Sequence, residues 1–160
     1  MAKKGKGKSN PSDGHKVLAR NKRATFDYQI DERFEAGIAL VGSEVKSIRD
    51  ARVSLGESYA TFDENGELWL EQAHIAEYPW ANRNNHEPTR RRKLLLNKRE
   101  LGQLSRAIDR AGFTLLSVAL YLKGGLIKVE LGLGKGKKVH DKRDSLKKRA
   151  HDREIERAVK

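Results

Sequence analysis

The sequence has no cysteine and few aromatic residues, and these absences exclude several classes of protein. Of its 160 residues, 6% are aromatic and none is cysteine. Disulfide-stapled secreted folds and zinc sites with cysteine ligands are therefore excluded, and a reducing, cytoplasmic compartment is expected. No apolar run approaches the roughly 18 residues that a membrane-spanning helix needs. The first residues also lack the apolar stretch of a secretory signal.

Motifs of catalysis and metal binding are missing as well. The chain has no G-x-S-x-G motif, and its five histidines are scattered without metal-ligand spacing. No pair of carboxylates is placed for acid–base work. The glycines of the segment GLGKGKK are a weak signal for a phosphate cradle, because they follow a predicted strand and lead into a charged tail. Neither an enzyme nor a bound cofactor or metal is predicted.

Positive charge is concentrated at the two ends of the chain. The formal net charge is +12. Residues 1–23 hold eight basic residues and one acid, residues 24–133 hold 15 and 16, and residues 134–160 hold 11 and 5. A nearly neutral body with two basic arms is typical of a protein that binds RNA or DNA, although an anionic membrane attracts such arms too.

This charge pattern predicts three parts. Residues 1–20 are expected to form a flexible basic arm, residues 21–133 an RNA-binding domain, and residues 134–160 a basic tail. The tail has no aromatic residue and few aliphatic ones, so it buries too little apolar surface to offset its ordering entropy. We expect it to be disordered when free and to fold on a polyanion.

Alternating apolar and polar residues predict a body made mainly of short strands. Two glycines follow Lys123 and predict a tight turn between the last two strands, and Asn65-Gly66 predicts an earlier hairpin. Six short strands with few helices indicate an antiparallel barrel or sandwich. The expected strands are residues 26–30, 34–41, 59–62, 67–75, 113–122 and 126–133.

Two helices are predicted between these strands. The first is the segment SEVKSIRD, with Ser43 as its N-cap. The second begins after Asn97, which forms a capping box with Glu100, and Gly112 ends it. Leu101, Leu104, Ile108 and Ala111 share one face of this helix. The polar segment 77–92 is predicted to be a loop, and the three arginines at its end either meet phosphates or contact nothing.

Four segments resemble the SsrA-binding protein family, also called small protein B. They are NKRATFDYQI, FEAGIALVGSEVKSIR, HEPTRRRKLLLNKREL and GKGKKVHDKR, in order and at matching spacing. The resemblance implies a mainly β fold, a small closed antiparallel barrel of the oligonucleotide-binding type with two short flanking helices and a basic C-terminal tail. It also implies a function in bacterial trans-translation, as the partner of transfer-messenger RNA rather than as an enzyme.

The resemblance implies particular partners and contact residues. The partners are the tRNA-like domain of transfer-messenger RNA, the stalled ribosome and, indirectly, elongation factor Tu; no membrane partner is implied, and a monomer is expected. Residues expected at the RNA-binding face are Asn21, Lys22, Arg23, Glu35, Leu95, Asn97 and Lys98, with Lys128, Lys135, Lys137 and Lys138 meeting phosphates. Residues expected at the ribosomal decoding centre are His140, Asp141, Lys142 and Arg143.

Two other classes stay open on the residues alone. A different ribosome-associated barrel, such as a ribosomal or initiation-factor-like protein, shares the basic arms but is expected to lack the HDKR segment. An enzyme acting on RNA needs a convergent acid–base or metal set, and the sequence shows none.

Overall fold

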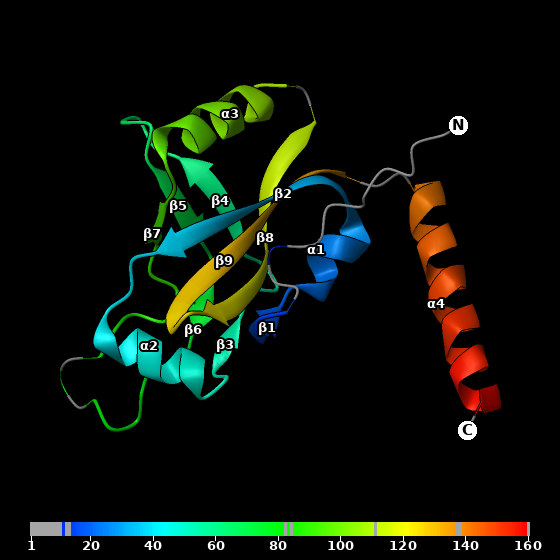
Figure 1. Ribbon diagram of the computed structural model, residues 1–160, viewed down its shortest axis with the longest axis horizontal. Coiled ribbons are helices and arrows are strands. Elements are labelled where there is room, and N and C mark those ends of the chain that lie inside the picture. The colour runs from blue at the N-terminus through cyan, green and yellow to red at the C-terminus, as the bar shows by residue number, and fades with distance from the viewer. Residues whose placement is uncertain are drawn as a thin grey trace.

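The computed structural model describes Pro11 and residues 14–81, 83, 85–110, 112–136 and 139–159. Within these residues the fold is mainly antiparallel β with four helices (Figure 1). The strands are β1 (Lys16–Arg20), β2 (Tyr28–Ile38), β3 (Val53–Ser54), β4 (Tyr59–Phe62), β5 (Leu68–Glu71), β6 (His74–Ile75), β7 (Arg92–Leu95), β8 (Phe113–Lys123) and β9 (Leu126–Gly136). The helices are α1 (Lys22–Asp27), α2 (Gly42–Arg49), α3 (Lys98–Ile108) and α4 (Val139–Val159).

Seven strands make one sheet in the order β1-β8-β4-β5-β7-β2-β9, and β3 pairs separately with β6. Strand β9 also pairs with β8, so the last strand of this order is joined to the second. The inward faces of the strands share one aliphatic core, whose fully buried members include Leu68, Leu70, Leu115, Leu120, Val129 and Leu131. Burial of these side chains is the main source of stability.

The predicted turns are confirmed. Gly124 and Gly125 join β8 to β9 with φ angles of 57° and 77°, which glycine adopts without strain. In the β4–β5 hairpin, Gly66 has a φ of 76°, and Asp63 accepts hydrogen bonds from the backbone of Asn65 and Glu67, each 2.9 Å long. The strand expected at 67–75 is two strands instead, because Gln72 takes a left-handed φ of 60° between β5 and β6.

The helix predicted after Asn97 is also confirmed. The Asn97 side chain accepts a hydrogen bond from the Glu100 amide at 2.8 Å, as an N-cap does. Leu104 is fully buried against the sheet, so α3 covers one end of the core. Gly112 follows the helix with a φ of 85°, whereas Ala111 lies outside the described residues.

The first part of the chain differs from the expectation in three ways. Phe26 lies in helix α1 rather than in a strand, because the Asn21 side chain caps that helix by accepting from the Ala24 amide at 3.0 Å. Residues 28–38 form one strand with a bulge between Ile30 and Glu32, not two strands. Lys16–Arg20, expected within a flexible arm, pairs with β8 as strand β1.

Helix α2 has the expected place but a different N-terminus. Ser43 is not the cap: the cap position is Val41, whose amide donates to the Glu44 carboxylate at 3.0 Å. The Ser43 hydroxyl instead bonds His86. The amide of the cap residue is therefore satisfied by the carboxylate of the third helical residue, and the Ser43 side chain does not cap the helix.

The tail residues Val139–Val159 form helix α4, which lies apart from the sheet beside α1 (Figure 1). One contact between the two is a cation–π pair, with the Arg149 guanidinium 5.1 Å from the Phe26 ring centre. The expected change from a disordered free tail to a helical bound one stays a prediction.

Candidate nucleic-acid interface

The side of β8, β9, β2 and β7 that faces away from the aliphatic core carries a row of four residues in register, of which Tyr121 is fully buried. Tyr121 is opposite Lys128, Lys128 is opposite Gly37, and Gly37 is opposite Leu95. Opposite residues in an antiparallel sheet point to the same side. Two residues expected to contact RNA, Lys128 and Leu95, therefore share one face although they come from different strands.

Gly37 keeps the space between these two side chains open. A β carbon at this position would lie 3.3 Å from the β carbon of Leu95, tighter than ordinary contact. Leu95 is 51% exposed, which is unusual for a leucine in a strand that also buries Leu94. An exposed aliphatic side chain beside a cation is suited to bind a nucleotide: the leucine can contact the ribose or base, and the lysine can contact the phosphate.

Glu35 lies two residues before Gly37 and so on the same face. Its carboxylate accepts from the Lys123 ammonium at 3.3 and 3.2 Å. Partial burial raises the pKa of Glu35, but the neighbouring Tyr121 hydroxyl and the charges of Lys123 and Lys128 outweigh it and hold the pKa below its ordinary value. The side chain is thus a fixed, ionised acceptor, able to read the amino or imino edge of an unpaired base.

Asn97 and Lys98 follow Leu95 where the chain enters α3. Strand β7 runs antiparallel to β2, so the chain after Leu95 heads toward the level of Glu35. Both residues are exposed, but the Asn97 side chain is engaged, since its amide donates to Glu100 at 2.8 Å while its oxygen caps the helix. Lys98 is the freer of the two for phosphate.

Asn21, Lys22 and Arg23 lie elsewhere. Tyr28 begins β2 just after α1, and seven residues of strand place Glu35 about 23 Å further on. Asn21 is 3% exposed, and its amide donates to the carbonyls of Leu55 at 2.8 Å and Ser117 at 3.0 Å. The expectation of a direct base contact from its side chain does not fit this burial, and Asn21 acts instead by positioning α1.

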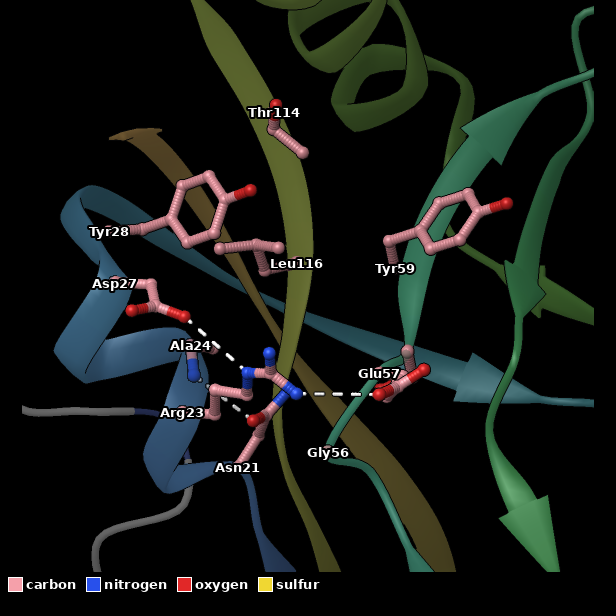
Figure 2. A pocket seen from close by; sticks show the side chains of 11 residues that line it. Asn21, Arg23, Ala24, Asp27, Tyr28, Gly56, Glu57, Tyr59, Thr114 and Leu116 are labelled. Atoms are coloured by element: carbon pink, nitrogen blue, oxygen red, sulfur yellow. Dashed lines mark hydrogen bonds and ion pairs between the residues drawn. The ribbon is translucent and has the colours of Figure 1, made fainter. Parts of the chain in front are cut away.

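Lys22 and Arg23 are exposed on that helix, and Arg23 lines a groove of about 380 Å³ (Figure 2). The Arg23 guanidinium spans one end of the groove, 3.5 Å from Asp27 and 3.3 Å from Glu57. Figure 2 shows the rings of Tyr28 and Tyr59 further along the groove, on either side of Leu116. Arg23 is therefore already partnered by carboxylates.

The remaining basic residues divide into described and undescribed ones. Lys135 is exposed at the end of β9, with its ammonium 4.5 Å from the Phe113 ring centre. Lys137 and Lys138 lie outside the described residues. Preceding glycines serve packing rather than a phosphate cradle: a β carbon on Gly132 would lie 2.8 Å from Val118, and one on Gly134 2.9 Å from the Gln29 carbonyl.

The four residues expected at the decoding centre fall in the first turns of α4. Arg143 is exposed. The backbone of His140, Asp141 and Lys142 is helical, but their side chains lie outside the described part. Their assignment to the ribosome stays a prediction.

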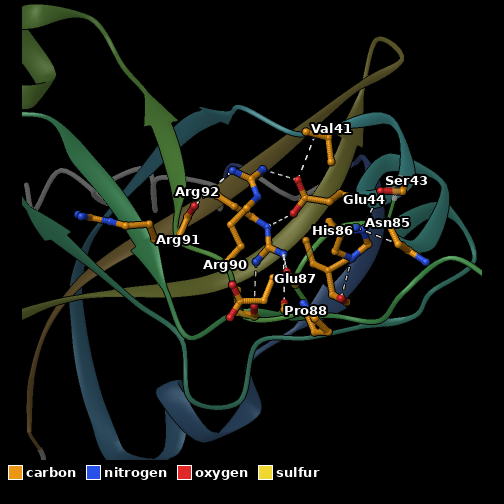
Figure 3. Close-up of polar contacts among 12 residues, drawn as sticks. Val41, Ser43, Glu44, Asn85, His86, Glu87, Pro88, Arg90, Arg91 and Arg92 are labelled. Carbon is orange, nitrogen blue, oxygen red and sulfur yellow. Dashed lines mark hydrogen bonds and ion pairs between the residues drawn. The ribbon is translucent and has the colours of Figure 1, made fainter. Parts of the chain in front are cut away.

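The three arginines at the start of β7, Arg90 to Arg92, correct the sequence interpretation (Figure 3). Arg92 is fully buried and pairs with Glu44, which is also fully buried. Arg90 pairs with the same carboxylate, and Arg91 reaches Glu71 at 3.2 Å. Each of the three arginines therefore has a carboxylate partner. Arg90 and Arg92 attach the loop to α2 and do not face outward toward phosphates. Nothing local in the sequence links Glu44 to arginines 46 and 48 positions away.

Lys123 is the residue at this face that sequence reasoning missed. It was read only as part of a turn, yet it supplies the cation that holds Glu35. A lysine that ends one strand of a hairpin lies on the same face as residues two and four positions before it. That spacing from Tyr121 was the available signal.

The residues that the structure describes contain no group of three histidine, aspartate or glutamate side chains that could hold a metal ion. None of their helices has both the length and the apolar character needed to cross a membrane.

A mainly antiparallel β domain with cations, a fixed carboxylate and an exposed leucine on one face, continued by a basic helix, is typical of proteins that bind nucleic acid. Comparison with known proteins then identifies the particular group. The chain belongs to the SmpB protein family, whose model matches residues 18–160. The family that the sequence resembles is thereby confirmed.

Known relatives are similar over most of their length. The SsrA-binding protein of Carboxydothermus hydrogenoformans is 53% identical over 145 residues, covering 91% of this chain and 97% of that protein. That of Oceanobacillus iheyensis is 48% identical over 150 residues, covering 94% and 97%. A solved structure described as "tmRNA-SmpB: a journey to the center of the bacterial ribosome" is 47% identical with a TM-score of 0.63, covering 75% of this chain and 84% of that one.

Proposed function

We propose that this protein binds the tRNA-like domain of transfer-messenger RNA and delivers it to stalled ribosomes for trans-translation. The proposal rests on the face formed by Glu35, Leu95 and Lys128, which joins an ionised acceptor, an apolar side chain and a cation. The names of the relatives, SsrA-binding protein, and the described complex with transfer-messenger RNA support it. The protein acts by binding and placing RNA, and is not an enzyme.

The fold suited to this task is a closed barrel of the oligonucleotide-binding type. The pairings support closure, because β8, β4, β5, β7, β2 and β9 each pair with the next and β9 pairs with β8. Such barrels bind oligonucleotides on an outward strand face. The row through Lys128, Gly37 and Leu95 crosses three of these strands.

The tail enters the ribosome. In this proposal His140, Asp141, Lys142 and Arg143 lie at the decoding centre, and the rest of α4 occupies the empty messenger path. Helix α4 carries exposed cations along its length, among them Lys147, Lys148 and Arg149, which ribosomal phosphates neutralise. Elongation factor Tu participates through the aminoacylated RNA, and the protein acts as a cytoplasmic monomer.

The central test is capture of RNA from a bacterial lysate by the tagged full-length protein, followed by sequencing. Transfer-messenger RNA should dominate in the unmodified protein and fall strongly with Glu35→Arg, while Glu64→Arg, an exposed turn position with the same charge change, should capture normally. Ribosomal RNA dominating both samples would favour another ribosome-associated barrel protein. Equal capture by the two variants would contradict the assigned face.

A second test separates body from tail. A chain ending after Lys138 retains every strand and α1 to α3, and it should bind transfer-messenger RNA nearly as well as the full chain. It should not support tagging of stalled peptides. Full tagging by the shortened chain would show that the tail is dispensable.

A further inference from the structure

Trp80 is an unexplained feature of the surface. It is 80% exposed, more than any other large hydrophobic residue among those described. The other tryptophan, Trp69, is half-buried, donates its indole N–H to Asp63 at 2.8 Å and carries the Arg91 guanidinium 4.4 Å above its ring. An indole in this position offers both faces of a flat aromatic ring to a ligand that can stack on it.

The turn from Tyr78 to Ala81, which carries Trp80, is held by defined hydrogen bonds. The Asn85 side chain clamps both backbone groups of Tyr78, accepting from its amide at 3.1 Å and donating to its carbonyl at 2.8 Å. The Ala81 amide bonds the same carbonyl at 3.1 Å, which makes the turn that places Trp80 at the tip. At the start of the segment, the Ala76 amide bonds the carbonyl of Arg52 at 3.0 Å.

The end of the segment is anchored in the buried polar cluster of Figure 3. His86 bonds the Ser43 hydroxyl at 2.8 Å and the Ile75 carbonyl at 2.9 Å. Arg92 donates to the Pro88 carbonyl at 3.1 Å while paired with Glu44. Because these contacts already fix the turn in the folded protein, binding a ligand at Trp80 does not have to pay the entropy cost of ordering it.

One cation lies against the turn that carries Trp80, and other basic residues belong to the elements that hold this turn. The Lys46 ammonium lies 5.3 Å from the ring centre of Tyr78, two residues before Trp80. Three arginines are also exposed: Arg49 ends α2, Arg52 follows it, and Arg83 lies between β6 and β7, three residues after Trp80. These four cations outnumber the exposed carboxylates of α2, its C-cap and the same segment, which are Asp50, Glu77 and Glu87. Aromatic rings interleaved with cations are the chemistry that binds single-stranded nucleic acid.

We propose that Trp80 is a stacking platform for an unpaired base of single-stranded RNA, with Lys46 and Arg83 meeting the adjacent phosphates. This surface adjoins α2, beyond the Ile38 end of β2, whereas α1 lies at the Tyr28 end (Figure 1). The turn that carries Trp80 lies in the connection between β6 and β7, and it contributes no residue to the face of Glu35, Leu95 and Lys128. A ring face reads no base edge, so binding here tolerates any sequence.

The two tryptophans make a matched pair of reporters. Trp69→Phe leaves Trp80 as the only indole, and Trp80→Phe leaves Trp69. Each full-length variant is titrated with a single-stranded oligonucleotide of about eight nucleotides and with its duplex, at fixed salt. The single strand should quench emission at least twofold in Trp69→Phe and change it little in Trp80→Phe, since the Trp69 ring is already covered by Arg91.

Affinity provides the second readout. Trp80→Ala should weaken binding of the single strand about tenfold, as expected for one lost stacked base, while the thermal midpoint stays unchanged because the ring is exposed. Equal quenching in both reporter variants, or equal quenching by duplex and single strand, would overturn the proposal. So would a Trp80 signal that responds to RNA-free ribosomal protein and not to RNA, which would assign the surface to a protein partner. Capture of transfer-messenger RNA is independent of every outcome here.

Discussion

Replacing Glu44 by glutamine should destabilise the fold more than its chemical similarity indicates. Glu44 is fully buried, pairs with Arg90 and Arg92, and accepts from the Val41 amide at the start of α2. Breaking a buried ion pair by removing one partner costs roughly 3–5 kcal/mol. Arg92 keeps its bonds to three carbonyls, those of Ala73, Glu87 and Pro88, so a loss of about 3 kcal/mol is expected, at the lower end of that range.

The assay is thermal unfolding followed by circular dichroism near pH 7. For a domain of this size, the loss lowers the melting temperature by roughly 6–12 °C. Glu64→Gln is the matched control, because Glu64 is exposed in a turn and should melt like the unmodified protein. A Glu44→Gln midpoint within about 2 °C of that control would refute the claim that this ion pair anchors the loop.

The same variant tests the sign of the pH dependence. Burial raises the pKa of Glu44, but the hydrogen bonds from Arg90, Val41 and Arg92 outweigh it and hold the pKa below the ordinary 4.5. A carboxylate with a depressed pKa in the folded state stabilises the fold above about pH 4.5, and this contribution is lost as pH falls through the folded value. The difference in melting temperature between Glu44→Gln and the unmodified protein should therefore become smaller below pH 4.5. A difference that does not change with pH would mean that Glu44 is not ionised in the folded protein.

Three further predictions concern RNA binding and the tail. Glu35→Arg should weaken binding of the tRNA-like domain by about 1–3 kcal/mol without lowering the melting temperature, and unchanged affinity in a titration would remove Glu35 from the interface. Lys123→Met should weaken the same binding, yet have no further effect when combined with Glu35→Gln, because Lys123 acts by orienting that carboxylate; additive losses would show that Lys123 contacts phosphate itself. His140→Ala should impair peptide tagging more than Lys147→Ala, since a stacked imidazole needs a defined position, and equal defects would reduce the tail to a polycation.

Elements with short-range signals could be predicted from the sequence. The turn after Lys123 has two glycines, which adopt left-handed φ angles without strain, and Asn97 carries its cap partner three residues on. In the same way, the Asn65-Gly66 pair marks a hairpin whose geometry is local. Each of these signals lies within four residues of the structure that it specifies.

Features that depend on distant partners could not be predicted. Strand β1 exists because β8, about 100 residues later, offers it hydrogen bonds. Asn21 was expected at the RNA-binding face, but its side chain is buried against the carbonyls of Leu55 and Ser117. The end of helix α1 was predicted to be part of a strand because Phe26 and Tyr28 alternate with polar residues, and the short helix ends between them.

The site shows the same division. The resemblance implied Glu35, Leu95 and Lys128 individually as RNA contacts, but that they share one side of the sheet depends on the register of β9, β2 and β7. Lys123 and the buried pair of Glu44 with Arg92 carried no local signal strong enough to compete with the reading of a turn and a loop.

The contact of Arg149 with Phe26 makes the tail helix a weak latch on the body. An exposed cation–π pair is worth about 0.5–1 kcal/mol, which corresponds to a latched state only roughly 2–5 times as populated as the released one. Releasing helix α4 from this contact therefore requires little free energy, and the body alone does not fix the position of the tail.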